Sequence, residues 1–120
     1  MRVLVEGLDA DAIGLTERQL QTDVELKLRT AGVKLDDSVG HFLYLNVNVL
    51  HSAGRATYCI GLAFEQRGTF DGGFRGFGTT WDTLAVGTVG EARAARYVRE
   101  HVGDLVDMFL NDYLKANPRH

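Results

Sequence analysis

The sequence predicts an α+β domain with the order β-α-β-β-β-α, in which two helices pack on one face of a four-stranded, mainly antiparallel sheet. Three observations support this class: a capped amphipathic helix near the start, alternating strands in the middle, and a long amphipathic helix at the end. A length of 120 residues, 45% of them hydrophobic, fits a single α+β domain covering residues 1–120.

The first helix is predicted at residues 17–31, because both of its N-terminal signals are present. Thr16 and Gln19 have the spacing of a capping box, in which each residue satisfies a backbone N–H of the other. Leu15 and Leu20 occupy the positions of a hydrophobic staple, which fixes how the chain enters the helix.

The remaining elements follow from the period of the apolar residues. Strands are predicted at residues 1–8, 41–50, 56–66 and 79–86. The segment 67–78 holds five glycines and three phenylalanines and is predicted to be a loop. A glycine turn at 87–90 then leads into a second helix at 91–116, which Asn117 and Pro118 end.

Composition excludes several classes of protein. The formal charge of −3 argues against a nucleic-acid binder, and no apolar run is long enough to span a membrane. Cys59 is the one cysteine, so the chain forms no internal disulfide and no cysteine-rich zinc site. Residues 1–8 lack the charged and apolar regions of a signal peptide.

No catalytic constellation is visible, and neither a metal site nor a cofactor is predicted. Cys59 has no neighbouring base, and the four histidines do not have metal-ligand spacing. The segment 85–90 nearly matches a dinucleotide fingerprint, but no second parallel strand follows it, which favours a glycine turn that lets the helix approach the sheet. The alternative is a small-anion site at the start of the second helix, formed by Gly87, Gly90 and Arg93.

Three groups of side chains point to interaction instead of catalysis. One is a flank of the second helix away from its apolar stripe, one is the outer face of the strand at 41–50, and one is the glycine-rich loop. The candidate partner-binding residues are, in that order, Tyr97, His101 and Met108; Tyr44, Asn46 and Asn48; and Phe70, Phe74 and Phe77. The loop phenylalanines either fold back on the sheet or contact another molecule.

The charges of the second helix oppose its dipole. Its first half carries arginines and its second half aspartates: Arg93, Arg96 and Arg99, then Asp104, Asp107 and Asp112. Either this is tolerated surface charge or it marks an electrostatic docking surface.

Three blocks of the sequence resemble short bacterial proteins of uncharacterised function. The first block consists of Gly14–Thr16, Gln19–Leu20, Thr22–Arg29 and Ala31–Val33, and the two others are Leu43–Asn48 and Gly87–Gly90. Proteins of that group are commonly exported, and the element order is similar to the N-terminal domain of the periplasmic protein TolB and related envelope assembly modules. The resemblance implies an interaction domain without a catalytic centre, in a periplasmic or secreted setting. Residues 67–78 depart from the pattern.

These observations predict a non-enzymatic interaction or assembly module, associated with the bacterial envelope, that binds a protein partner and self-associates as a homo-oligomer. The alternative is a small-ligand-binding protein with a pocket between the sheet and the loop 67–78. A third hypothesis, an enzyme, would require a cleft that gathers Asp, His or Arg residues from distant parts of the chain.

Overall fold

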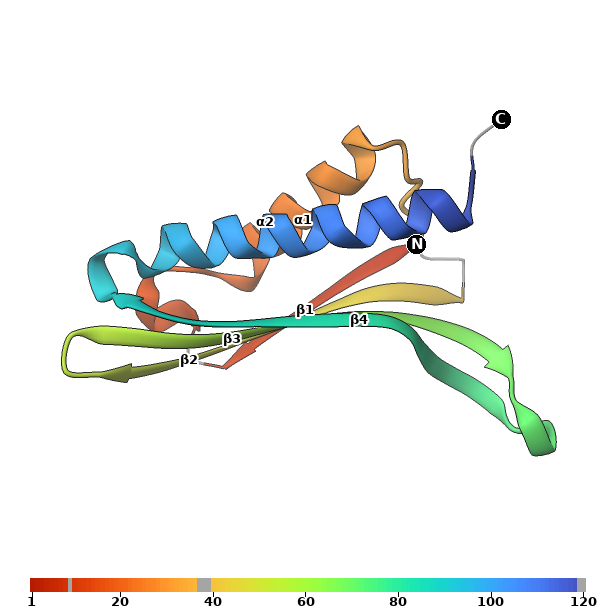
Figure 1. Cartoon of the computed structure of the whole chain (residues 1–120), viewed down its shortest axis with the longest axis horizontal. Coiled ribbons are helices and arrows are strands. Elements are labelled where there is room, and N and C mark those ends of the chain that lie inside the picture. Colours follow the sequence, from red (N-terminus) through yellow and green to blue (C-terminus); the bar gives the residue numbers. More distant parts are fainter. Residues whose placement is uncertain (9, 37–39, 119–120) are drawn as a thin grey trace.

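The computed structural model describes residues 1–8, 10–36 and 40–118, and it confirms the predicted α+β class and element order (Figure 1). Two short 3₁₀ helices, η1 and η2, accompany the main elements. The elements are β1 (Arg2–Leu8), η1 (Ala10–Ile13), α1 (Glu17–Thr30), β2 (His41–Ser52), β3 (Arg55–Thr69), η2 (Asp71–Gly73), β4 (Arg75–Gly90) and α2 (Glu91–Ala116).

The four strands form one sheet in the spatial order β1-β2-β3-β4. β1 runs parallel to β2, since α1 carries the chain back over the sheet between them, and the two other pairs are antiparallel. Helix α1 packs on β1, while α2 lies over β3 and β4, so both helices cover the same face (Figure 1). The opposite face of the sheet, called here the outer face, has no helix on it among the residues described above.

The hydrophobic core lies between the helices and the inner face of the sheet. Alternate residues of each central strand enter it, which is the pattern expected of a sheet with one buried face. Its largest fully buried side chains include Leu43, Leu45, Ile60 and Leu62 from the strands and Leu20, Leu28, Val102 and Phe109 from the helices. The Phe109 ring lies 5.2 Å from the rings of both Phe64 and Trp81, which joins α2 to β3 and β4.

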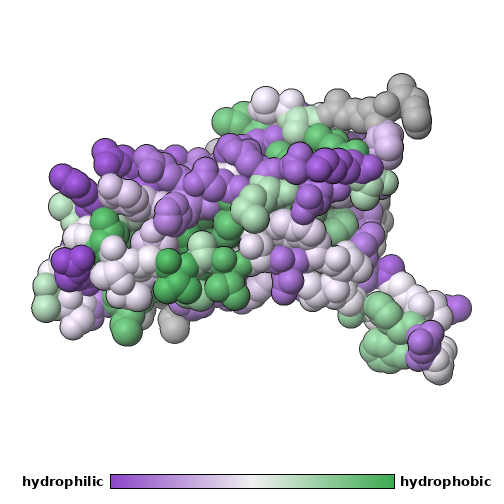
Figure 2. All heavy atoms as spheres, in the orientation of Figure 1, coloured by the Kyte–Doolittle hydropathy of each residue, from purple (hydrophilic) through white to green (hydrophobic). Residues whose placement is uncertain are grey.

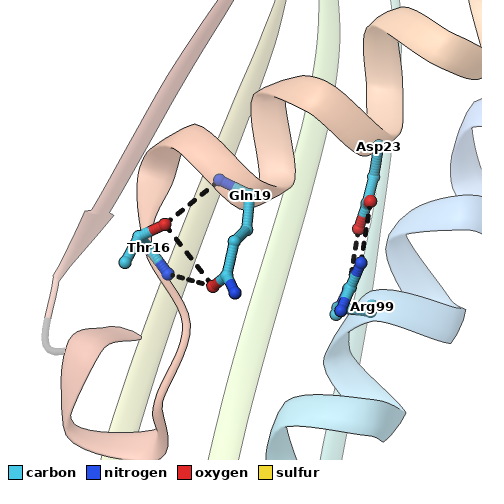
Figure 3. A network of polar contacts seen from close by, with 4 residues as sticks. All are labelled: Thr16, Gln19, Asp23 and Arg99. Atoms are coloured by element: carbon cyan, nitrogen blue, oxygen red, sulfur yellow. Dashed lines mark hydrogen bonds and ion pairs between the residues drawn. The ribbon is translucent and has the colours of Figure 1, made fainter.

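Helix α1 begins with the predicted capping box. The Thr16 hydroxyl accepts a hydrogen bond from the Gln19 backbone N–H at 3.1 Å, and the Gln19 side chain accepts one from the Thr16 N–H at 2.9 Å (Figure 3). Farther along α1, Asp23 accepts two hydrogen bonds from the Arg99 guanidinium of α2, at 2.8 and 2.9 Å (Figure 3). Together these contacts fix the start of α1 and its position beside α2.

The prediction of a loop at 67–78 is wrong. β3 continues to Thr69 and β4 starts at Arg75, so the segment is the end of a long hairpin that projects beyond the helices (Figure 1). An irregularity in the pairing at Phe64 and Glu65 precedes this projecting part. The predicted turn at 87–90 is also extended, since β4 continues to Gly90 and α2 starts at the next residue.

Candidate interaction surface

The predicted residues Tyr44, Asn46 and Asn48 lie together on the outer face of β2. Their side chains form a ladder along the strand: Asn48 Nδ2 donates to Asn46 Oδ1, and Asn46 Nδ2 donates to the Tyr44 hydroxyl at 3.1 Å. The Tyr44 hydroxyl donates in turn to Glu6 Oε2 of β1 at 2.9 Å. The middle of the outer face is therefore a hydrogen-bonded polar row, with its side chains held in place by one another.

Beside the hairpin, arginine and phenylalanine side chains alternate across the outer face. Arg2 lies over the Phe42 ring at 5.7 Å, Phe42 meets Phe77 edge to face at 5.3 Å, and Arg67 lies over Phe77 at 5.3 Å. These four residues come from four different strands and are called here the arginine–phenylalanine strip. An open hollow of about 540 Å³ adjoins it, lined by Arg67 and Phe77 together with Gly68, Thr69, Arg75 and Gly76. Cationic groups over aromatic faces stabilise the strip while leaving the guanidinium N–H groups able to bind an anion.

From the far end of β2 across to β4, the outer face carries exposed aliphatic side chains, and the sheet register sets Leu84 and Val86 level with Asn46 and Asn48 of the polar row. Leu50, Leu84 and Val86 are 71%, 67% and 63% exposed, which is unusual for three large aliphatic residues on one face of a sheet. The sheet register sets Val86 against Cys59, and a hollow of about 290 Å³ lies among Leu50, Cys59, Val86 and their neighbours. We call Leu50, Cys59, Leu84 and Val86 the apolar end. Composition gave no sign of it, although the alternation along 79–86 could have located Leu84 and Val86 on one face.

The three predicted phenylalanines of the hairpin do not form one patch. The Phe70 ring lies over Gly78 and the Phe74 ring over Gly76, where added Cβ atoms would come within 2.5 and 2.9 Å of ring carbons. Phe77 alternates with these glycines along β4, so its ring projects from the opposite face of the hairpin, where it belongs to the arginine–phenylalanine strip. Phe70 and Phe74 thus pack on their own hairpin, and contact of the three phenylalanines, which stay 40–63% exposed, with another molecule stays a prediction.

The predicted helix flank lies on the side of α2 that faces the β4 edge of the sheet. His101 Nδ1 lies 2.9 Å from the Tyr58 hydroxyl, and Trp81 of β4 donates to Asp112 at 2.8 Å. Met108 shares this side by helical spacing and is 51% exposed. Tyr97 carries the Arg96 guanidinium over its ring at 5.4 Å. Burial raises the pKa of Tyr58, and the nearby Tyr97 raises it further.

The residues of the predicted anion site have separate structural positions. Gly87 lies inside β4 beneath the Tyr58 ring, whose hydroxyl oxygen would be 2.5 Å from an added Cβ. Gly90 precedes α2, where the Glu91 N–H donates to the Gly54 carbonyl at 3.1 Å, and Arg93 is exposed on the first turn. The Glu91 carboxylate, 2.6 Å from His51 Nδ1, already places negative charge at this helix end. Gly87 thus has a packing role, and anion binding stays a prediction.

The reversed charges of α2 are explained in part by contacts with other elements. Arg99 pairs with Asp23, and Asp107 accepts from Lys27 of α1 at 2.9 Å. The Arg99 pKa lies above its ordinary value because Asp23 accepts its hydrogen bonds. The two interhelical ion pairs lie on the α1 side of α2, opposite the flank of Tyr97 and Met108.

Within the described residues, no group of three or more His, Cys, Asp or Glu side chains is placed to hold a metal ion. Over the same residues, no helix is long and apolar enough to cross a membrane. A pocket between the sheet and residues 67–78 stays a prediction, since the hollow at this place is lined by residues of the hairpin itself.

Comparison with known proteins yields a likeness in structure but not in sequence. No protein-family model matches the chain, and no curated protein matches it. Among solved structures, it is similar to the crystal structure of the rare lipoprotein B from Shewanella oneidensis. The two are 13% identical, the alignment covers 97% of this chain and 96% of that one, and the TM-score is 0.47.

Proposed function

We propose that this protein is a non-enzymatic interaction module of the bacterial envelope that docks a protein partner on the outer face of its sheet. One observation carries the proposal: the helices cover a single face, and the other face presents the arginine–phenylalanine strip and the apolar end. A solvated sheet face is usually polar, so exposed aliphatic side chains there favour a contact surface. The envelope setting rests on the sequence resemblance to exported bacterial proteins.

The charges near the strip favour an acidic partner. Arg2, Arg67 and Arg75 extend from the outer face around Glu65, so this end of the face has a positive balance. Arginine guanidinium groups bind carboxylates through paired hydrogen bonds, and the flanking rings shield those bonds from water. The partner segment therefore carries carboxylates where it meets the strip and apolar side chains where it meets the apolar end.

The two ends of the face set the size of that segment. Phe42 and Leu50 mark them on the same strand, and eight residues of strand span about 27 Å. An extended segment of about eight residues, or a helix of about 18, covers this distance. The polar row of Tyr44, Asn46 and Asn48 lies between and supplies hydrogen-bonding groups for the middle of the segment.

A titration followed by nuclear magnetic resonance tests the proposal. The probe is a synthetic peptide with glutamates in one half and leucines in the other, added to the isotope-labelled full chain. Amide shifts are expected along Arg2, Phe42, Arg67 and Phe77, and Arg67→Gln should weaken binding about fivefold, the effect of losing about 1 kcal/mol. Arg18→Gln is the matched control, since Arg18 is exposed on α1. Shifts confined to the helices, or equal losses from both substitutions, would contradict the proposal.

A further inference from the structure

We propose that a second copy of this chain pairs with the first through the β4 edges, in antiparallel orientation, to form one continuous eight-stranded sheet. This inference goes beyond partner docking because it uses the edge of the sheet, whereas docking uses its outer face. It rests on three observations about β4 and α2: an unprotected edge, a self-complementary pattern of side chains, and an exposed flank of α2 over the same edge.

From Trp81 to Gly90, the β4 edge lacks most of the features that keep sheet edges apart, and the pairing irregularity at Phe64 and Glu65 lies before this stretch. β4 is the terminal strand of the sheet, and residues 76–90 contain no proline, no lysine, and Asp82 as their one charged side chain. A long edge without such residues is a template for pairing with another strand. The opposite edge differs, because β1 is only 7 residues long and Gln21 Nε2 of α1 lies 3.5 Å from its Val3 carbonyl oxygen.

The side chains of β4 are complementary to themselves in one register. If Ala85 faces Ala85 of the second copy, each Leu84 lies opposite a Val86, and such apolar cross-strand pairs stabilise a sheet. The same register sets Asp82 opposite Thr88, which keeps the two Asp82 carboxylates about 20 Å apart. A register centred on Leu84 would instead set Val86 against Asp82. In the register centred on Ala85, the exposed Leu84 and Val86 side chains of one copy are continuous with those of the second copy across the new strand pair.

The exposed flank of α2 lies above the same edge. α2 runs back over β4 from their junction at Gly90. Ala85 lies about 17 Å from Gly90 along β4, and α2 covers the same distance in about 11 residues. The helix position above Ala85 is therefore close to His101, in agreement with the Trp81–Asp112 contact farther along. Figure 2 shows hydrophobic side chains gathered below α2, along the side of the molecule on which β4 is the front strand.

Pairing would bring the two α2 helices into contact. Each α2 lies over β3 and β4, so with strands about 4.8 Å apart the two helix axes would be about 10 Å apart, the ordinary distance for packed helices. Because Tyr97 and Met108 lie on opposite sides of the two-fold axis, Tyr97 of one copy faces Met108 of the other. This contact covers the predicted flank, and the symmetric arrangement closes after two copies.

The strand pairing alone has the scale of a specific interface. Residues 81–89 of two copies would form about nine inter-strand hydrogen bonds, within the range of about 10 ± 5 for typical interfaces. The Leu84–Val86 pairs on the outer face and the α2 contact on the inner face add apolar burial on both sides of those bonds. The pairing leaves both arginine–phenylalanine strips exposed, at the two distant ends of the joined sheet.

Sedimentation velocity of the full chain, from low to high micromolar concentration, tests the pairing. The expected result is a monomer–dimer equilibrium that Leu84→Lys weakens at least tenfold. Leu50→Lys is the matched control, because Leu50 is as exposed as Leu84 but lies on β2, two strands from the edge. Its dissociation constant should stay within twofold of the unmodified chain. A strict monomer, or equal losses from the two lysine variants as in face-to-face packing, would overturn the proposal.

Cysteine cross-linking gives a second readout that does not depend on a destabilising charge. In a Cys59→Ser background, Leu84→Cys and Val86→Cys chains are mixed and oxidised. Opposed strand residues lie about 4.5–5.5 Å apart between Cα atoms, which suits a disulfide. The mixture should yield cross-linked dimers, whereas Leu50→Cys, mixed with either chain, should not. Absence of the Leu84–Val86 cross-link in a chain that dimerises would refute the β4 register, and partner docking would be unaffected.

Discussion

Replacing Gly87 with alanine is expected to destabilise the fold, because Gly87 lies directly beneath the Tyr58 ring. An added Cβ would be 2.5 Å from the Tyr58 hydroxyl oxygen and 2.6 Å from Cζ. The ring cannot easily move aside, since Tyr58 is 3% exposed and its hydroxyl lies 2.9 Å from His101 Nδ1. Overpacking of this kind costs about 1–3 kcal/mol. For a chain of this length, about 4 °C of Tm corresponds to 1 kcal/mol, so Tm should fall by about 4–12 °C.

Urea and thermal unfolding measure this effect, and Gly61→Ala is the matched control. Gly61 lies in the neighbouring strand β3, and no atom is within 4 Å of the Cβ that alanine would add there. Its substitution should change the free energy of unfolding by less than about 1 kcal/mol. If Gly87→Ala were as stable as Gly61→Ala, the packing explanation for Gly87 would be wrong. Binding of a small anion would then be the alternative explanation for a glycine at this position.

Three further substitutions test other parts of the fold. Phe109→Ala should lower the free energy of unfolding by about 3–5 kcal/mol in urea titrations, because Phe109 is 1% exposed and contacts rings from β3 and β4. A smaller loss than that of a surface substitution would refute its central place in the core. Thr16→Ala should cost about 1 kcal/mol and Thr16→Ser far less, since only alanine removes the capping oxygen; equal losses would mean that the cap contributes nothing. Burial, and then the N-terminal ammonium group, lower the pKa of His41 from 6.5, so the unfolded chain binds more protons below that value. The free energy of unfolding should therefore fall as the pH drops through 6.5 and level off below the folded-state pKa. His41→Gln should reduce this fall in acid titrations while leaving the free energy of unfolding at pH 8 nearly unchanged. An unaltered acid profile would show that His41 is not the source of the pH dependence.

Local signals allowed the helices and central strands to be predicted. The capping box of α1 involves residues three positions apart, and the alternation along β2 assigns each side chain to a face without knowledge of the rest of the fold. The projecting hairpin could not be predicted in this way. Its glycines indicated a loop, and the packing of Phe70 on Gly78 depends on a strand register that no short pattern encodes.

The candidate surface was predictable only where it follows one strand. Tyr44, Asn46 and Asn48 were found by alternation, and the structure joins them in one hydrogen-bonded row. The arginine–phenylalanine strip draws one residue from each of four strands, so it exists only once the sheet has formed. The charges of α2 had the same limit, because the Arg99–Asp23 pair joins residues 76 positions apart.

The rings of Phe70 and Phe74 restrict the freedom of the projecting hairpin. A glycine-rich segment ordinarily samples many backbone conformations, and ordering it on binding lowers affinity. Here the rings cover Gly78 and Gly76, so the segment that carries Arg67 and Phe77 is ordered before any partner arrives. Truncating Phe70 or Phe74 would then slow association or weaken binding through chain entropy alone, although neither ring belongs to the arginine–phenylalanine strip.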